Sequence, residues 1–247
     1  MNAMIEIKNL KKKFNSNEVL RGVNLNIDRG ETLVIIGPSG CGKSVLLKHI
    51  IGIYSPDEGE VIIDGEDITK MNNKDLYRIR KRFGFQFQGS ALFDSMTVGE
   101  NVGLGLVENT ELKQDEVDRI VKEKLELVGL PGVEDLMPAD LSGGMKKRVA
   151  LARSLATEPD IILYDEPTTG LDPIMSDQID ELIKELSAKL KVTSVVVTHD
   201  IFSVYDVADN VALMHEGKIY FHGTPSELIS SKDPVIKLFL NRTSKRI

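Results

Sequence analysis

The chain has 247 residues, one cysteine, and 38 acidic against 31 basic side chains. This length suits one large α/β domain or two small ones, and the 41% of apolar residues is typical of a globular protein. The formal charge of −7 argues against general electrostatic binding of nucleic acid, and the lone Cys41 excludes an internal disulfide framework. No apolar run approaches the roughly 18–20 residues that span a bilayer. Strand-like sequence begins by Met4, so we expect a cytosolic protein without a secretory or transit segment.

The first third of the chain is predicted to be rich in strands. Residues 4–8 and 23–27 alternate between apolar and polar side chains. Thr32–Ile36 is continuously apolar, which is expected of a strand buried on both faces. A glycine-rich loop and a helix follow, and then a further strand at 60–63 ends in the tight-turn pair Asp64-Gly65.

The middle of the chain, from about 72 to 156, is mostly helical in pattern, with an apolar stripe along 114–128. The last third returns to buried-strand runs at 161–164 and 194–197, which flank a predicted helix at 176–190. A closing hairpin is predicted at 211–221. This pattern favours one α/β domain over 1–231 with a helical subdomain, 72–156, inserted into it. A short amphipathic helix and a basic tail are expected over 232–247.

One motif between a buried strand and a helix predicts a phosphate-binding loop. It has the pattern G-x-x-x-x-G-K-[ST] and reads Gly37-Pro38-Ser39-Gly40-Cys41-Gly42-Lys43-Ser44. Glycines let main-chain N–H groups converge on phosphate oxygens, and the following helix adds its positive N-terminus. In such a loop Lys43 would neutralise the β- and γ-phosphates, and the Ser44 hydroxyl would ligate Mg²⁺.

A second motif places two carboxylates at the end of the apolar strand near 161. Asp165 is positioned there to hold Mg²⁺ directly or through water, and Glu166 to polarise an attacking water. A third motif is Leu141-Ser142-Gly143-Gly144, in which Ser142 is a good helix N-cap and the glycines allow close approach of a ligand. The Lys146-Lys147-Arg148 run that follows is read as a solvated face.

The order of these motifs resembles the ATPase subunit of ABC transporters. The resemblance covers about residues 4–231 and includes Gln88, Gly170-Leu171-Asp172, and His199 after a buried strand. It implies a P-loop NTPase core of mainly parallel sheet with an antiparallel β subdomain and an inserted helical subdomain. It also implies a head-to-tail homodimer, in which each ATP lies between the phosphate loop of one subunit and the Ser142 element of the other.

Roles for individual residues follow from the resemblance. Phe14 matches the aromatic residue that stacks on adenine, and the phosphate segment extends through Val45. Gln88 matches the glutamine that touches Mg²⁺ or water beside the groove for a membrane partner. Gln86 is the competing position, but the residues that follow Gln88 align better. The remaining matches are Asp172, which communicates across the dimer, and His199, which contacts the γ-phosphate.

Met145 replaces the glutamine that most of the family carries at this position. Together with 89–98 and 100–102, it resembles the subfamily that serves Mla-type, Mce-associated phospholipid transport. This likeness implies an integral membrane permease, an Mce-type lipid-binding protein and a small regulatory subunit as partners, at the cytoplasmic face of the inner membrane. An importer of amino acids or other polar solutes is the alternative. A non-transport ABC ATPase is less favoured, because the sequence has no second nucleotide domain, coiled-coil insertion or zinc-binding cysteines, and its net charge is −7. A catalytically silent binding subunit is less favoured because Lys43, Asp165, Glu166 and His199 are intact.

Overall fold

The computed structural model describes residues 3–244 and contains two sheets. The larger sheet has six strands in the order β10-β9-β3-β8-β7-β6, in which all neighbours run parallel except the hairpin β9–β10. Its strands are β3 (Thr32–Ile36), β6 (Phe83–Gln86), β7 (Ile161–Asp165), β8 (Thr193–Val197), β9 (Asn210–His215) and β10 (Lys218–Gly223). The predicted parallel core is therefore confirmed.

The central strands are buried on both faces, as their mostly apolar sequence predicts. Leu33 and Ile35 of β3 point into one hydrophobic cluster, and Val34 and Ile36 point into the other. Because β3, β8 and β7 are parallel neighbours, their carboxyl ends lie side by side at one end of the sheet. Ligands bind at this end in open α/β sheets.

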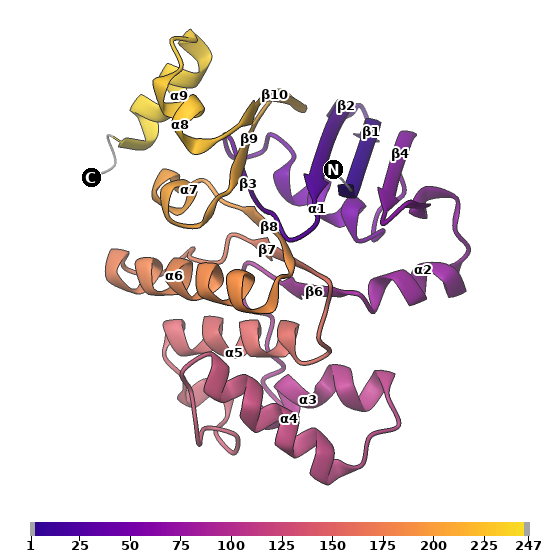
Figure 1. The fold of residues 1–247 in the computed structure, drawn as a ribbon, viewed down its shortest axis with the longest axis vertical. Helices are drawn as coiled ribbons and strands as arrows, with labels where there is room; N and C mark the ends of the chain where they lie inside the picture. The colour runs from indigo at the N-terminus through magenta and orange to yellow at the C-terminus, as the bar shows by residue number, and fades with distance from the viewer. Residues whose placement is uncertain (1–2, 245–247) are drawn as a thin grey trace.

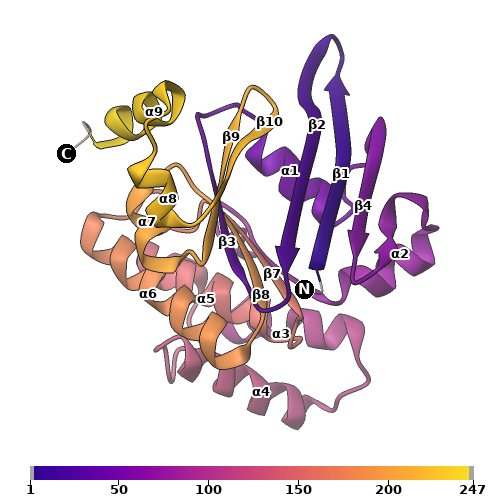
Figure 2. The same ribbon diagram turned by 45° about the horizontal axis from the view of Figure 1, so that its top comes forward.

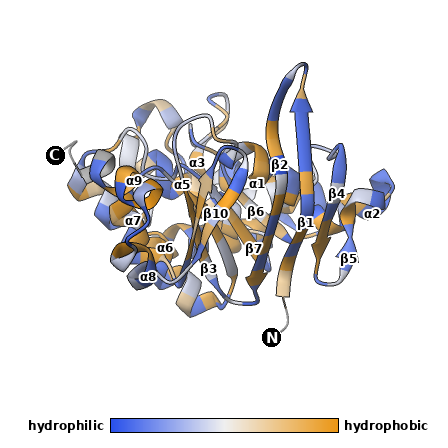
Figure 3. Ribbon diagram, turned by 90° about the horizontal axis from the view of Figure 1, so that it is seen from above, coloured by the Kyte–Doolittle hydropathy of each residue, from blue (hydrophilic) through white to orange (hydrophobic). Residues whose placement is uncertain are grey.

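The second sheet is antiparallel and forms a separate layer, which Figure 2 shows with α1 (Lys43–Ile50) between the two sheets. Its order is β2-β1-β4-β5, with β1 (Ala3–Phe14), β2 (Asn17–Asp28), β4 (Glu58–Ile63) and β5 (Glu66–Asp67). The inward side chains of these strands share one core with α1 and with the face of the larger sheet that carries Leu33 and Ile35. Hydrophobic residues concentrate in the central strands, whereas the outer part of β1 is hydrophilic (Figure 3). The antiparallel subdomain implied by the family resemblance is present.

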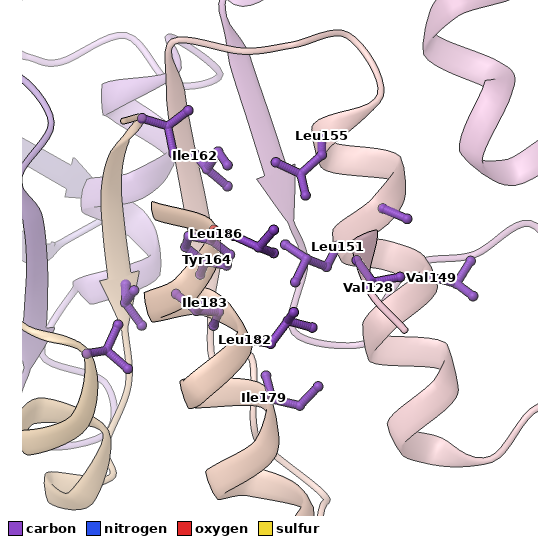
Figure 4. Close-up of a cluster of buried hydrophobic side chains, with 14 of the residues drawn as sticks. Val128, Val149, Leu151, Leu155, Ile162, Tyr164, Ile179, Leu182, Ile183 and Leu186 are labelled. Carbon is purple, nitrogen blue, oxygen red and sulfur yellow. The ribbon is translucent and has the colours of Figure 1, made fainter. Parts of the chain in front are cut away.

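Helices cover the other face of the larger sheet and extend away from it in Figure 1. They are α3 (Val98–Asn109), α4 (Gln114–Leu127), α5 (Gly143–Leu155), α6 (Pro173–Leu190) and α7 (Ile201–Val207), while α2 (Asn73–Arg80) precedes β6. In Figure 4, Leu151 of α5 points toward Leu182 and Leu186 of α6, and Tyr164 of β7 lies beside Leu186. This packing joins the helical segment to the strand that ends at Asp165.

Strand β6 was not predicted, because its residues lie within the segment read as mostly helical. Phe83–Gln86 pairs in parallel with Ile161 to Tyr164 of β7 and so belongs to the larger sheet. Gly84 allows this pairing under α5, since a Cβ there would lie 2.3 Å from the carbonyl oxygen of Ser154. Helix α2 precedes this strand, and helices α3, α4 and α5 follow it.

The chain continues past the sheet into α8 (Pro225–Ser230) and α9 (Pro234–Ser244). Helix α9 begins at Pro234, as expected for a proline in a first helical turn, and Ile236 is buried. The basic tail predicted at 242–246 lies outside the described side chains. Within 3–244, no helix combines the length and apolar character needed to cross a membrane.

Candidate functional site

The phosphate loop connects β3 to α1 in a conformation that depends on its glycines. Gly37 has a φ of 152°, and a Cβ at this position would lie 2.2 Å from the carbonyl oxygen of Met214 in β9. Gly42 caps α1 with a φ of 107°, in the left-handed region that favours glycine. Pro38, Ser39 and Gly40 are exposed at the outer turn of the loop. The main chain is thereby left open to a ligand at the N-terminus of α1.

The Lys43 side chain folds back into this loop. It is 7% exposed, and its ammonium donates hydrogen bonds to the carbonyl oxygens of Gly37 at 2.8 Å and Pro38 at 3.3 Å. The buried cation therefore already lies at the mouth of the loop. Cys41 and Val45 beside it are half-buried, and burial raises the pKa of the Cys41 thiol.

Ser44 and Asp165 meet although 121 positions separate them. The Ser44 hydroxyl donates to Asp165 Oδ1 at 2.8 Å. Burial is the main cause that raises the pKa of Asp165, and the charge of Glu166 adds to it, while the Ser44 hydrogen bond opposes it. A hydroxyl and a carboxylate beside a phosphate loop fit Mg²⁺, which takes oxygen ligands from one or two protein groups and fills the rest of its shell with phosphates and water.

Glu166 has an unusual main-chain conformation, and hydrogen bonds hold both its main chain and its carboxylate. Its φ is 52°, and its N–H donates to the carbonyl oxygen of Val197 in β8 at 2.8 Å. Its Oε2 lies 2.7 Å from His199 Nδ1 and accepts a hydrogen bond from Thr169 Oγ1 at 3.2 Å. The structure thus joins the two predicted residues Glu166 and His199 in one pair. Sequence reasoning missed Thr169, whose hydroxyl reaches the Glu166 carboxylate because the chain makes a tight turn between the two residues.

The structure separates the two glutamines that competed for one role. Gln86 is fully buried beneath α5, and its Nε2 donates to the carbonyl oxygen of Lys147 at 3.4 Å. Gln88 is exposed in the loop after β6. Only Gln88 is therefore placed to reach a ligand outside the fold.

The reading of residues 146–148 as a solvated face was wrong for Lys147. This side chain is only 5% exposed, and its ammonium donates to the carbonyl oxygens of Gln88 and, at 3.4 Å, of Glu166. Arg148 is half-buried and donates to the carbonyl oxygen of Val128 at 2.9 Å. Charge alone misled the interpretation, because long cationic side chains also serve as donors to buried carbonyl groups.

Ser142 and Asp172 begin two neighbouring helices at the surface. Ser142 Oγ accepts from the Met145 N–H at 3.3 Å as the N-cap of α5, and Asp172 Oδ1 accepts from the Met175 N–H at 3.0 Å as the N-cap of α6. Both residues and Gly143 are exposed, whereas Gly144 is buried against Met175. Within the described chain, the hydrogen bonds of these two side chains go only to their own helix N-termini.

Phe14 lies at the end of β1 and is 37% exposed. Its ring packs edge-on against Tyr54 at 5.3 Å between centroids, and the Lys12 ammonium lies 5.6 Å from its centroid. A partly exposed aromatic ring held at its edge is compatible with stacking on a base. The structure does not bring Phe14 into contact with the other predicted site residues.

The buried strand, the phosphate loop and the carboxylates at the strand ends together define a P-loop nucleotide hydrolase. The model of the ABC transporter family matches residues 20–169, and the chain belongs to this family. It is therefore an ABC ATPase that hydrolyses ATP.

Relatives cover most of the chain. The intermembrane phospholipid transport system ATP-binding protein MlaF of Haemophilus influenzae is 43% identical over 98% of this chain and 91% of its own length. The probable ribonucleotide transport ATP-binding protein mkl of Mycobacterium leprae is 43% identical over 98% of this chain and 70% of its own.

Solved structures agree in fold. A dimeric ATP-binding cassette in a post-hydrolysis state with bound ADP and phosphate superposes with a TM-score of 0.82 and 35% identity, covering 90% of this chain and 99% of that chain. The cbiO1 protein of Clostridium perfringens, part of an ABC transporter complex, gives a TM-score of 0.86 and 34% identity, covering 97% and 96%.

Proposed function

We propose that this ATPase powers phospholipid transport through an integral membrane permease, at the cytoplasmic face of the inner membrane. The likeness to MlaF over nearly the whole chain is the observation that carries the proposal. The resemblance of Met145, together with residues 89–98 and 100–102, to the subfamily that serves phospholipid transport supports it as well. A polar-solute transporter is the second candidate, and the name of the mycobacterial relative, a probable ribonucleotide transport protein, favours it.

The chemistry is an in-line attack of water on the γ-phosphate of ATP. Lys43 neutralises charge on the β- and γ-phosphates after its ammonium leaves the carbonyl groups of the loop. Glu166 orients and polarises the attacking water, and His199 holds the Glu166 carboxylate and reaches the γ-phosphate.

Ser44, Asp165 and the exposed Gln88 would hold Mg²⁺. When bound, this ion neutralises developing charge on the phosphate oxygens. The protein's part is to keep the two oxygens of Ser44 and Asp165 together, as their 2.8 Å hydrogen bond does.

A second copy of the chain completes the site. Two solved structures of one related cassette are dimeric. Ser142, Gly143 and Asp172 are exposed at the N-termini of α5 and α6, where backbone N–H groups favour an anion. ATP bridging two copies would favour the closed dimer, and hydrolysis would remove the bridge.

A groove of about 1030 Å³ beside the Gln88 loop is suited to the permease. Its apolar floor comes from β6 and the loop that follows, and Arg153 of α5 lines it as well. Phe87 and Phe93 are exposed there, 40% and 49%, which is a large apolar surface for a protein to leave uncovered. An Mce-type lipid-binding protein and a small regulatory subunit remain predictions.

One experiment tests the cargo. The ATPase is purified with its native permease, and the co-extracted lipid is identified by mass spectrometry. Phospholipid should co-purify, and vesicle phospholipid should stimulate ATP hydrolysis. Stimulation by a ribonucleotide or an amino acid instead of lipid would contradict the phospholipid assignment and favour the second candidate.

A mixing experiment tests the shared site. Lys43→Ala and Ser142→Arg each leave a homodimer with no intact composite site, whereas a mixed dimer has one. Equal mixing should therefore restore hydrolysis to a substantial fraction of the wild-type rate. No recovery, with mixed dimers shown to form, would argue against completion of the site by a second copy.

A further inference from the structure

The loop after β6 has a main-chain conformation that L-residues rarely adopt. Ser90 and Ala91 have φ values of 62° and 47°, so two successive non-glycine residues are left-handed. Each costs on the order of 1 kcal/mol relative to ordinary backbone. Such a conformation persists only where surrounding groups hold it.

Helix α5 supplies the groups that hold this loop. The Arg153 guanidinium donates to the carbonyl oxygens of both Ser90 and Ala91, each at 2.7 Å. Two turns earlier on the same helix, the Lys147 ammonium donates to the carbonyl oxygen of Gln88. Two cations of one helix thus fix three carbonyl groups in four residues.

Lys147 also reaches across the site to the carboxylate strand. Its ammonium lies 3.4 Å from the carbonyl oxygen of Glu166, a residue that is itself left-handed. Within the described residues Lys147 forms no ion pair, and both of its hydrogen-bond partners are main-chain oxygens. One buried nitrogen therefore ties the main chain of Gln88 to that of Glu166.

We infer that Lys147 is a positioning residue for ATP hydrolysis, which sets the Gln88 loop and Glu166 at a fixed distance from each other. This inference rests on the roles proposed above for Gln88 and Glu166. Both side chains must reach the same terminal phosphate and its water, and a displacement of about 1 Å can cost about a hundredfold in rate. Arg153 holds the Ser90 and Ala91 carbonyl groups of the same loop, so that the position of the loop is set by α5.

The test compares Lys147→Met and Lys147→Arg with the control Lys146→Met in the full-length protein. Lys146 is half-buried on the same helix, and its side chain has no hydrogen-bond partner among the described residues. Turnover is measured by phosphate release, nucleotide affinity by calorimetry with a slow-hydrolysing ATP analogue, and folding by thermal melting.

Lys147→Met should lower kcat about ten- to hundredfold while ATP affinity changes less than about threefold. Lys147→Arg keeps a donor and should retain at least several times the kcat of Lys147→Met, and Lys146→Met should match the wild type. This split between kcat and affinity, with rescue by arginine, is not expected of a residue that only stabilises the fold.

Wild-type turnover in Lys147→Met, or an equal loss in Lys146→Met, would overturn the inference. If Lys147→Met does not fold, Lys147→Gln replaces it, because an amide retains one donor group without the charge. Turnover that stays normal in every folded Lys147 variant while Glu166→Gln is inactive would refute Lys147 alone. Normal turnover in Glu166→Gln would refute the proposed site itself.

Discussion

The proposed site has two halves, one at the end of the larger sheet and one at the N-termini of α5 and α6. They differ in how many of their side chains are already buried and hydrogen-bonded within a single chain. At the carboxyl ends of β3, β7 and β8, Lys43, Asp165 and Glu166 are buried and already paired with neighbours. At the N-termini of α5 and α6, Ser142 and Asp172 are exposed and cap only their own helices. The sheet preorganises the first half, whereas the second half presents donors outward. A site completed by a second copy of the chain requires this difference, because the exposed half of one copy must be free to contact the nucleotide held by the other.

The largest effect is expected in the prepared half. Glu166→Gln should lower turnover about a hundred- to ten-thousandfold, since the amide cannot accept a proton from water. ATP binding should persist, and a nucleotide-bound dimer should accumulate, measured by size-exclusion chromatography with ATP. The control Glu216→Gln makes the same change at another left-handed glutamate, φ 46°, in the β9–β10 turn, and it should leave turnover unchanged. A wild-type hydrolysis rate in Glu166→Gln would refute the assignment.

Lys43→Ala should weaken binding of an ATP analogue about a hundredfold or more, because charge-assisted hydrogen bonds to two phosphates are lost. Calorimetry on dilute protein measures this affinity. Ser142→Ala, in the outward half, should leave the affinity of a single subunit unchanged. Equal affinities for Lys43→Ala and the wild type would remove the distinction between the two halves.

Asp180 is a buried carboxyl group in α6, the helix that begins after Asp172. It is 2% exposed, and its Oδ2 accepts from the Ser203 hydroxyl of α7 at 2.6 Å, while Oδ1 has no partner among the residues that the structure describes. Burial, with smaller contributions from the charges of Asp200, Asp206 and Asp177, raises the pKa of Asp180 to about 7, against a hydrogen bond from Ser203 that lowers it.

The folded chain therefore holds this proton up to a higher pH than the unfolded chain, whose aspartate ionises near 3.8. Asp180 contributes most favourably at low pH, and its contribution is lost as the pH rises from about 4 to 7. Relative to the wild type, Asp180→Asn should gain on the order of 2–3 kcal/mol in unfolding free energy between pH 4.5 and pH 8. Urea unfolding at both values measures the difference, and parallel pH profiles would contradict it.

The smallest effect is expected from Thr169→Val, which removes one donor to Glu166 but leaves His199 in place. A loss of roughly 1 kcal/mol corresponds to about a fivefold fall in kcat. Thr169→Ser keeps the hydroxyl and should stay near the wild type. A larger fall for Thr169→Val than for His199→Ala, both measured by phosphate release, would reverse the order of importance of these two contacts.

Some elements could be predicted from the sequence because a single pattern determined them. Thr32–Ile36 and the strands near 161 and 194 are mostly apolar, since both of their faces are buried, and the phosphate loop has a fixed spacing. Strand β6 could not be predicted in this way, because Phe83-Gly84-Phe85-Gln86 is short and contains a glycine that only the packing of α5 explains.

Side chains that act through tertiary contacts were also missed. Lys147 lies in a cationic run that resembles a solvated surface, and its carbonyl partners are 59 and 19 residues away along the chain. Thr169 contacts Glu166 through a turn whose shape depends on the left-handed conformation of Glu166. Neither contact leaves a local pattern in the sequence.

The half-buried thiol of Cys41 has a consequence for chemical labelling. Because burial raises its pKa, little thiolate exists at neutral pH, and the thiolate is the form that alkylating reagents and oxidants attack. Maleimide should therefore modify this only cysteine slowly, and the phosphate loop should resist mild oxidation. Introduced surface cysteines can then carry fluorophores for distance measurements on a chain that needs no prior cysteine removal.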